Sequence, residues 1–159
     1  MDAYDVYLAA PLFNDAEKAF NEQLALKLEG MGLHVFLPQR DGLEFAALEE
    51  LSPDARNRRL FALDVSNVEA SPTIVALLDG RVPDEGVCVE VATGREYSKL
   101  TGRSKLILGL KTDERTWLPG GNLNPMITGT LDRLFDSEAS LLAFVKDNLT
   151  KIRGVRREP

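Results

Sequence analysis

Cysteine and histidine are nearly absent from this sequence, which contains only Cys88 and His34. A single cysteine excludes an internal disulfide framework, and one residue of each kind cannot supply the four ligands of a Cys/His zinc site. Apolar runs are short, and none approaches the ~20 residues that a membrane-spanning helix needs. The amino-terminal residues also lack the basic segment and cleavage pattern of a signal peptide. We therefore expect a cytoplasmic protein that has no contact with membranes.

Basic residues are in the minority too. Lys and Arg total 19 against 25 Asp and Glu, which gives a net charge of −6. Because nucleic-acid binding depends on clustered basic side chains, this balance argues against a nucleic-acid partner. What the chain does have is a globular composition, with 159 residues of which 44% are hydrophobic and 28% charged. This predicts one folded domain over residues 1–150, followed by a basic, loose tail over residues 151–159.

Strand-like and helix-like segments alternate along the chain. Short apolar runs predict buried strands at residues 5–10, 33–37, 73–78 and 105–110. Amphipathic stretches predict helices at residues 16–31, 52–67, 87–100, 125–134 and 137–149. Residues 41–51 fit either a short helix or a loop. The alternation implies right-handed crossovers and therefore a single-domain, doubly wound α/β fold of the flavodoxin or Rossmann type, with a parallel sheet of about five strands and helices on both faces.

Ligands of such sheets bind beyond the carboxyl ends of the strands. After the third expected strand the chain reads Pro83-Asp84-Glu85-Gly86-Val87-Cys88-Val89-Glu90. Asp84 falls in the loop, Gly86 permits a sharp turn into the next helix, and Glu90 falls in about its first turn. The helix dipole stabilises an anion there by roughly 0.3–1 kcal/mol, so we expect Glu90 to stay ionised at neutral pH and to suit a nucleophile. The alternative is that Glu90 merely favours the start of the helix.

Two more side chains stand out, each with an ordinary explanation beside the functional one. Asp64 lies in the carboxyl-terminal half of a helix among apolar neighbours, where an acid opposes the helix dipole. Such a conflict is typical of a functional residue, but an ion pair with Arg58 or Arg59 explains it as well. Tyr7 lies in the middle of the first strand, where a tyrosine usually fills the core and donates its hydroxyl to a backbone carbonyl.

Five short motifs follow one another along the chain, and their order is informative. They are Tyr7-Leu8-Ala9-Ala10-Pro11-Leu12-Phe13, Leu37-Pro38-Gln39-Arg40-Asp41-Gly42, Asp64, the stretch from Pro83 to Gly94, and Asn124-Pro125-Met126. Taken singly, Gln39 lies in a plain turn, and helix capping explains Asn124. Together they resemble the nucleoside 2-deoxyribosyltransferase family, from Tyr7 to about Phe144. The most specific part is the Asp-x-Gly-x-x-x-Glu-x-x-x-Gly pattern of residues 84–94.

The resemblance implies a retaining transfer of 2-deoxyribosyl groups between nucleobases, with no metal or organic cofactor. Glu90 would be the nucleophile, Tyr7 would orient it, and Asp64 would protonate or hydrogen-bond the leaving base. The other site residues would bind substrate: Asp84 a sugar hydroxyl, Gln39 the base, and beside them Asn124, Phe13, Met126 and Gly86. The expected partners are deoxynucleosides, free nucleobases and further copies of this chain. The copies would form a dimer or a trimer of dimers, in which Asn124 reaches the active site of a neighbouring subunit.

Two other functions remain open at this point. In related N-glycosidases of deoxynucleoside 5′-monophosphates, water takes the sugar and a serine-type phosphate grip stands where this chain has Asp84. A carboxylate ~4 Å from a phosphate is repelled by about 4 kcal/mol per unit charge at an effective dielectric constant of 20, unless Arg40 or Arg81 offsets it. A non-catalytic nucleotide-sensing module could also use this scaffold. The chain departs from many relatives in having Ser71-Pro72 in place of an acid, and residues 153–159 offer no aromatic site residue.

Overall fold

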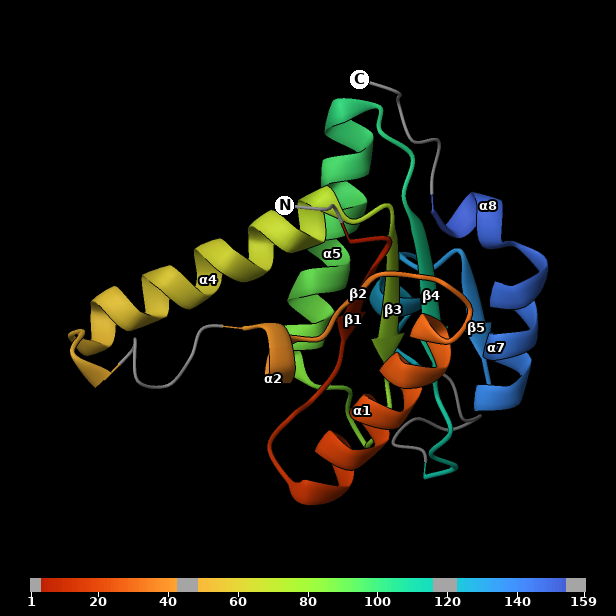
Figure 1. Ribbon diagram of the computed structural model, residues 1–159, viewed down its shortest axis with the longest axis horizontal. Coiled ribbons are helices and arrows are strands. Elements are labelled where there is room, and N and C mark those ends of the chain that lie inside the picture. Colours follow the sequence, from red (N-terminus) through yellow and green to blue (C-terminus); the bar gives the residue numbers. More distant parts are fainter. Residues whose placement is uncertain (1–3, 43–48, 116–122, 154–159) are drawn as a thin grey trace.

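A computed structural model of the chain describes residues 4–42, 49–115 and 123–153. Five parallel strands form one sheet in the order β2-β1-β3-β4-β5 (Figure 1). The strands are β1 (Val6–Ala9), β2 (Val35–Phe36), β3 (Thr73–Leu77), β4 (Leu106–Leu110) and β5 (Arg133–Phe135). The helices are α1 (Asp15–Glu29), α2 (Pro38–Asp41), α4 (Pro53–Ala70), α5 (Glu85–Thr101), α6 (Pro125–Thr128), α7 (Glu138–Asp147) and α8 (Leu149–Ile152). This is the flavodoxin-like strand order of a doubly wound sheet, which confirms the predicted fold class.

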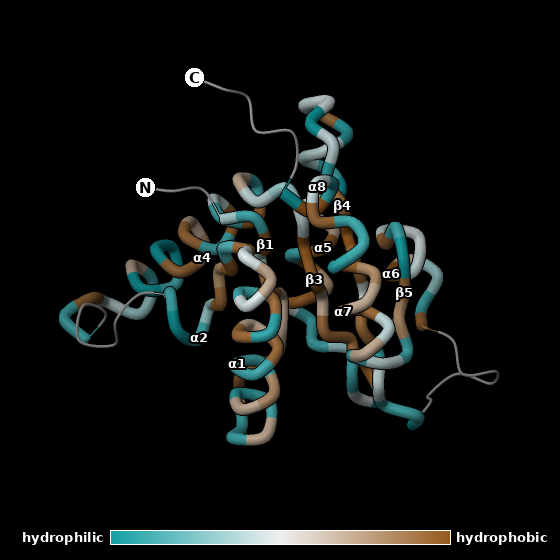
Figure 2. Tube along the Cα trace, turned by 45° about the vertical axis from the view of Figure 1, so that its right-hand side comes forward, coloured by the Kyte–Doolittle hydropathy of each residue, from teal (hydrophilic) through white to brown (hydrophobic). Residues whose placement is uncertain are grey.

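Helices cover both faces of the sheet because successive strand residues point to opposite sides. Val6 and Leu8 of β1 belong to a core shared with α1, α7 and α8. Tyr7 and Ala9 belong to a second core, which includes Val68 of α4 and neighbouring residues of α5. Figure 2 shows the central strands in the colours of hydrophobic residues, with polar segments on the helices around them. Strands β1 to β4 are buried and almost entirely apolar, as expected for a sheet covered on both faces, whereas the edge strand β5 begins with two exposed residues.

Local sequence signals account for the helix starts. Asn14 forms a capping box with Glu17 at the start of α1, and the Ser52 hydroxyl accepts the Ala55 N–H at the start of α4. The amino-terminal part of α4 extends away from the sheet, and its carboxyl-terminal part lies along α5 (Figure 1). The predicted helices 16–31, 52–67 and 87–100 are confirmed to within a few residues at each end. Helices α4 and α5 together carry most of the candidate site.

Two local predictions were wrong. The turn around Gln39 is the short helix α2, because Pro38 starts a helical turn that the backbone N–H of Gly42 closes on the Pro38 carbonyl. Residues 125–134 do not form one helix: α6 ends at Thr128, and Arg133–Phe135 is the edge strand β5. The backbone there pairs with β4 instead of continuing the helix, which a local pattern does not reveal. Of the ambiguous segment 41–51, residues 43–48 lie outside the described part.

The predicted loose tail begins later than residue 151. Ile152 belongs to α8, its side chain is buried, and its carbonyl accepts a hydrogen bond of 2.9 Å from the Thr73 hydroxyl. Arg153 donates to the Gly32 carbonyl at 3.0 Å. These contacts bind residues 151–153 to the domain, since an apolar side chain and a backbone carbonyl both gain partners there. Residues 154–159 lie outside the described part of the chain.

Candidate active site

A tyrosine and a glutamate 83 positions apart meet between the sheet and α5. The Tyr7 hydroxyl donates a hydrogen bond of 2.6 Å to Oε1 of Glu90. The Tyr7 ring is fully buried in β1 and stacks on Phe36 with ring centroids 5.4 Å apart. Packing therefore holds the ring in place, and the hydroxyl points at the carboxylate instead of at a backbone carbonyl. A short hydrogen bond to a charged acceptor is among the stronger ones in proteins.

Asp64 of α4 completes a group of three polar side chains. It lies close enough to the Tyr7 hydroxyl for their interaction to oppose the rise in the pKa of the Asp64 carboxyl, and the charge of Asp64 acts on Glu90. The alternative explanation for Asp64 was an ion pair with Arg58 or Arg59. The described residues show no such pair: Asp64 faces Tyr7, and both arginines are exposed. Two carboxyl groups and one phenol thus share a single, largely buried environment.

A cleft of about 290 Å³ opens beside these acids, between α4 and α5. Its walls are apolar residues and carboxylates spaced about one helical turn apart on each helix. The lining residues are Phe61, Asp64, Val65 and Val68 of α4, and Glu85, Gly86, Val89, Glu90 and Thr93 of α5. Sequence reasoning missed most of the walls, although the spacing 61-64-65-68 on one helix and 86-89-90-93 on the other was available as a signal. A flat ring of a small-molecule ligand can pack against such apolar walls.

The expectation that Glu90 stays ionised at neutral pH was wrong. Glu90 is the sixth residue of α5, beyond the first turn, and the side chain of Asp84 caps that helix instead. Burial raises the pKa of Glu90 to about 7, and the hydrogen bond from Tyr7 opposes that rise. The charges of Asp64 and Asp84 raise it further. Desolvation therefore dominates the dipole effect, and Glu90 changes charge close to neutral pH.

Burial raises the pKa values of the other two members of the group as well. It raises the pKa of the Asp64 carboxyl, with the Tyr7 hydrogen bond opposing. Burial, followed by the Glu90 charge, holds the pKa of the Tyr7 phenol far above its usual range. Tyr7 therefore acts as a permanent hydrogen-bond donor. Glu90 accepts the tyrosine's hydrogen bond, and Asp64 lies beside this pair with a pKa above its ordinary value.

Glu90 leads to a stability prediction that does not depend on turnover. The pKa of Glu90 in the folded protein, about 7, lies above its ordinary 4.5, so the folded state binds the proton more tightly than the unfolded chain. Its contribution to stability is then present below about pH 4.5 and is lost as the pH rises through about 7. Glu90→Gln cannot ionise. We expect its melting temperature to rise relative to wild type between pH 5 and pH 8, measured by scanning fluorimetry.

The exposed carboxyl of Glu85 on the same helix provides the matched control. Glu85→Gln should show a difference from wild type that hardly changes over this pH range, because no burial of charge is relieved. A melting-temperature difference for Glu90→Gln that stayed constant with pH would contradict the assignment of Glu90 as the titrating group.

Asp84 and Gly86 lie at the amino-terminal end of α5. Oδ1 of Asp84 accepts the backbone N–H of Val87 at 3.1 Å and so caps the helix. A Cβ atom on Gly86 would lie 3.0 Å from that same oxygen, so glycine leaves room for the capping carboxylate. The cap uses one carboxylate oxygen, and Asp84 still raises the pKa of Glu90 by its charge. Asp84 therefore belongs to the same electrostatic environment as the cleft.

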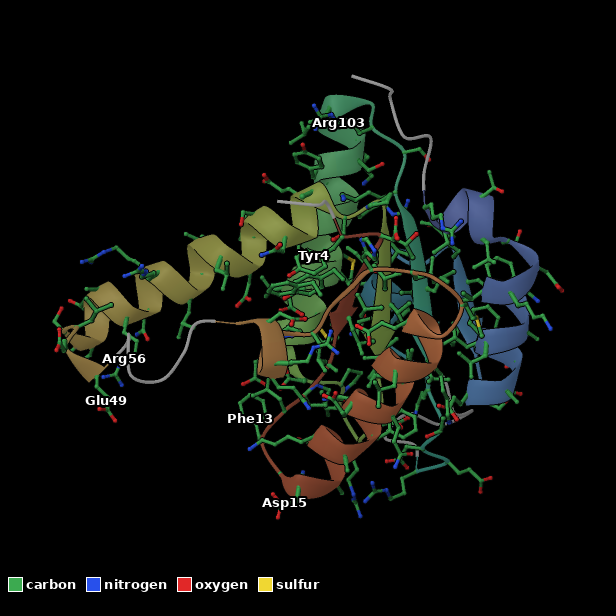
Figure 3. All side chains as sticks on the ribbon, in the orientation of Figure 1. Tyr4, Phe13, Asp15, Glu49, Arg56 and Arg103 are labelled. Atoms are coloured by element: carbon green, nitrogen blue, oxygen red, sulfur yellow. The ribbon has the colours of Figure 1, made fainter. Side chains whose placement is uncertain are left out.

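Gly86 lines the cleft, whereas Asp84 and the other candidate binding residues do not. The Gln39 side chain accepts from Asn21 at 3.0 Å and donates to the Lys18 carbonyl at 2.9 Å, so it joins α2 to α1. Phe13 is 76% exposed at the edge of the molecule, where the chain enters α1 (Figure 3). Met126 is 80% exposed, and Asn124 caps α6 by accepting the Met126 N–H at 2.9 Å. Roles for these residues in binding remain predictions.

Arg40, which lies outside the cleft, has acidic partners of its own. The Arg40 guanidinium pairs with Glu29 at 2.7 Å and with Asp41 at 3.0 Å, which raises the pKa of Arg40 above its usual range.

Among the described residues no group of three or more His, Cys, Asp or Glu side chains is placed to hold a metal ion. Nor does any helix in residues 4–42, 49–115 or 123–153 have the length and apolar character needed to cross a bilayer.

A flavodoxin-like sheet with a tyrosine and two carboxyl groups beside an apolar cleft is suited to glycosyl transfer, in which one carboxylate attacks and another group moves a proton. Comparison with protein families agrees with this class. The sequence model of the nucleoside 2-deoxyribosyltransferases matches residues 6–142. The chain belongs to that family, which implies nucleoside and base substrates and activity of the deoxyribosyltransferase kind.

Solved structures with the same fold include three that cover most of this chain. A conserved protein from Enterococcus faecalis V583 has 25% identity and a TM-score of 0.73, with 90% of this chain and 97% of that chain covered. A 2-deoxyribosyltransferase from Bacillus psychrosaccharolyticus has 20% identity and a TM-score of 0.69, covering 86% and 89%. A 2-deoxyribosyltransferase from Leishmania mexicana has 20% identity and a TM-score of 0.59, covering 91% and 98%. No curated protein matches the sequence.

Proposed function

We propose that this protein exchanges the nucleobase of 2′-deoxynucleosides, by way of a covalent deoxyribosyl-Glu90 intermediate and with net retention at the anomeric carbon. The observation that supports this most directly is the 2.6 Å hydrogen bond from Tyr7 to a buried Glu90, with Asp64 beside it. A carboxylate that is partly desolvated and held by one donor is a better nucleophile than a solvated one. The apolar cleft next to it offers walls against which a base can pack.

In the first half-reaction a carboxylate oxygen of Glu90 forms a bond to the anomeric carbon of the sugar. The bond from that carbon to the ring nitrogen of the base breaks, and its electron pair leaves with the base. Asp64, whose pKa is raised by burial, gives its proton to the departing base. The second base then attacks the ester and returns a proton to Asp64. Two inversions at one carbon give net retention.

Asp84 and Tyr7 would select the sugar. We propose that the Asp84 carboxylate accepts a hydrogen bond from a sugar hydroxyl, since hydroxyl groups are good donors to carboxylates. An added 2′-hydroxyl would compete for the Glu90 oxygen or crowd the Tyr7 ring, which is fully buried. The proposal therefore includes a preference for 2′-deoxy sugars.

The charges of the site disfavour the rival hydrolysis of 5′-monophosphates. The cleft lining contains Asp64, Glu85 and Glu90 and, within the described residues, no lysine or arginine. Arg40, a candidate for balancing a phosphate, is engaged by Glu29 and Asp41. A phosphate placed near these carboxylates would be repelled by several kcal/mol at short range. An uncharged nucleoside meets no such repulsion.

The function is tested by incubating the protein with thymidine and adenine. We expect thymine and deoxyadenosine to appear in equal amounts by liquid chromatography, and intact-mass spectrometry to detect a deoxyribosyl adduct when the second base is withheld. Uridine in place of thymidine should react far more slowly. Release of free deoxyribose with no new nucleoside would identify a hydrolase, and binding without any product would identify a sensing module; either outcome contradicts the proposal.

We further propose that the protein is a homo-oligomer, a dimer or trimer of dimers, with active sites shared between subunits. Supporting this, the cleft is rimmed by apolar side chains that remain uncovered, Phe61 at 65% and Val89 at 58% exposure, and Asn124 lies on the surface away from the lining. Light scattering should report more than one subunit. Co-expression of Asn124→Ala with Glu90→Ala chains should restore part of the activity that each variant lacks alone. A monomer that is fully active would refute the shared site.

A further inference from the structure

We propose that Gly94 is a positioning residue: by having no side chain it lets α5 approach β3 closely enough for Glu90 to reach Tyr7. This inference rests on the proposed roles of Glu90 and Tyr7 and adds a requirement on how the two are brought together. Gly94 is buried in the interior of α5. Glycine in the interior of a helix is less stable than alanine, so its presence there calls for a packing reason.

The packing reason lies in the sheet beneath the helix. A Cβ atom on Gly94 would stand 2.3 Å from Cδ1 of Ile74 and 3.5 Å from Cγ1 of Val68. The first distance is far inside van der Waals contact, so either the helix or the isoleucine would have to move. Ile74 is fully buried in β3, which leaves its side chain little room to turn aside. Because burial restricts rotation of Ile74 Cδ1, we expect an alanine at this position to push α5 away from the sheet.

The strand register connects this contact with the catalytic pair. Tyr7 of β1 and Ile74 of β3 are direct partners across the two strands, and both belong to the core on the α5 side. Glu90 and Gly94 are four residues apart on α5, so they lie on the same side of the helix, one turn from each other. Two neighbouring contacts thus join α5 to two paired strands: Gly94 on Ile74 and Glu90 on Tyr7. A displacement of the helix at Gly94 is carried to Glu90.

The hydrogen bond between Tyr7 and Glu90 is sensitive to such a displacement. It is 2.6 Å long, and a lengthening of several tenths of an ångström takes an O–H···O contact beyond the normal range. The loss would have two consequences. The nucleophilic oxygen would no longer be held in place, and the donor that lowers the pKa of Glu90 would be lost, while burial and the charges of Asp64 and Asp84 still raise that pKa.

The chain offers a compensating variant for the test. Ile74→Val removes Cδ1, the atom that an alanine at position 94 would strike, and leaves Cγ1 at an ordinary 3.7 Å. We expect Gly94→Ala to lower the base-exchange rate about 10²-fold at neutral pH, the order found for small misplacements of catalytic groups. Ile74→Val alone should stay near wild type, and Gly94→Ala/Ile74→Val should recover most of the lost rate.

Two further readouts separate positioning from a general loss of stability. The midpoint of the acid limb of the pH–rate profile should move upward in Gly94→Ala and return in the double variant. The carboxyl of Glu90, followed by carbon NMR in protein labelled at glutamate, should show the same movement without substrate. Adding Tyr7→Phe to Gly94→Ala should cost little more, because the hydrogen bond is already lost. Unfolding curves of each variant establish that the measurements refer to folded protein.

The outcomes have distinct meanings. A Gly94→Ala protein with wild-type rate and titration, or a folded double variant that recovers neither, overturns the positioning role. Should Gly94→Ala alone fail to fold, the double variant decides: recovery supports the role, and a folded double variant that is inactive refutes it. If wild-type protein exchanges no bases, the proposed function fails, while the titration of Glu90 still tests Gly94.

Discussion

Replacement of Glu90 by alanine is expected to lower the rate of base exchange by about 10⁴-fold or more and to eliminate the covalent adduct. Removal of a nucleophile in other enzymes that form covalent intermediates has effects of this order or greater. The change removes one lining side chain and leaves the rest of the cleft lining, which other residues of α4 and α5 contribute. Deoxynucleoside affinity, measured by calorimetry, should therefore change little.

Glu85→Ala is the matched control for this experiment. It removes a carboxylate from the same helix and the same cleft, but one that is exposed and to which no step of the reaction is assigned. Its exchange rate should remain close to wild type. If Glu90→Ala exchanged bases at the wild-type rate, Glu90 would not be the nucleophile, and the assignment of Tyr7 and Asp64 around it would lose its basis.

The second large effect is expected in the dependence of the rate on pH. The first half-reaction needs Glu90 as a carboxylate, and the pKa of Glu90 is raised by burial to about 7. Below that value the fraction of reactive enzyme falls tenfold for each pH unit, so kcat/KM for the deoxynucleoside should show an acid limb with a midpoint near 7. The groups that set this midpoint are the Tyr7 hydroxyl, which lowers it, and the charges of Asp64 and Asp84, which raise it.

Tyr7→Phe tests the origin of this limb. The phenylalanine retains the ring that stacks on Phe36 and loses only the hydroxyl that donates to Glu90. The pKa of Glu90 should then rise, and the midpoint of the acid limb should move to higher pH. At pH 6 the variant would lose more activity than at pH 9. A midpoint that stayed in place, or moved to lower pH, would show that the hydroxyl does not stabilise the carboxylate.

The positions of the candidate base-binding residues indicate which part of the site a single chain does not form. Gln39 is engaged with α1, while Phe13, Asn124 and Met126 lie on the surface. Tyr7, Asp64 and Glu90 by contrast are brought together by the fold of one chain. The proposed reacting centre therefore lies within one subunit, and the residues still expected to contact the base are those for which a second copy is proposed.

The sequence by itself determined the α/β class, the main helices and their capping residues, and the spacing that places Asp84, Glu90 and Gly94 on one helix. These features depend on interactions within a few residues, such as the Asn14 capping box and the apolar strands. Only the tertiary structure decided that Arg133–Phe135 is an edge strand, that the Tyr7 hydroxyl donates to Glu90 at 2.6 Å, and that burial raises the pKa of this carboxyl to about 7. Strand pairing and the desolvation of Glu90 depend on segments far apart in the chain, so a local sequence pattern does not predict them.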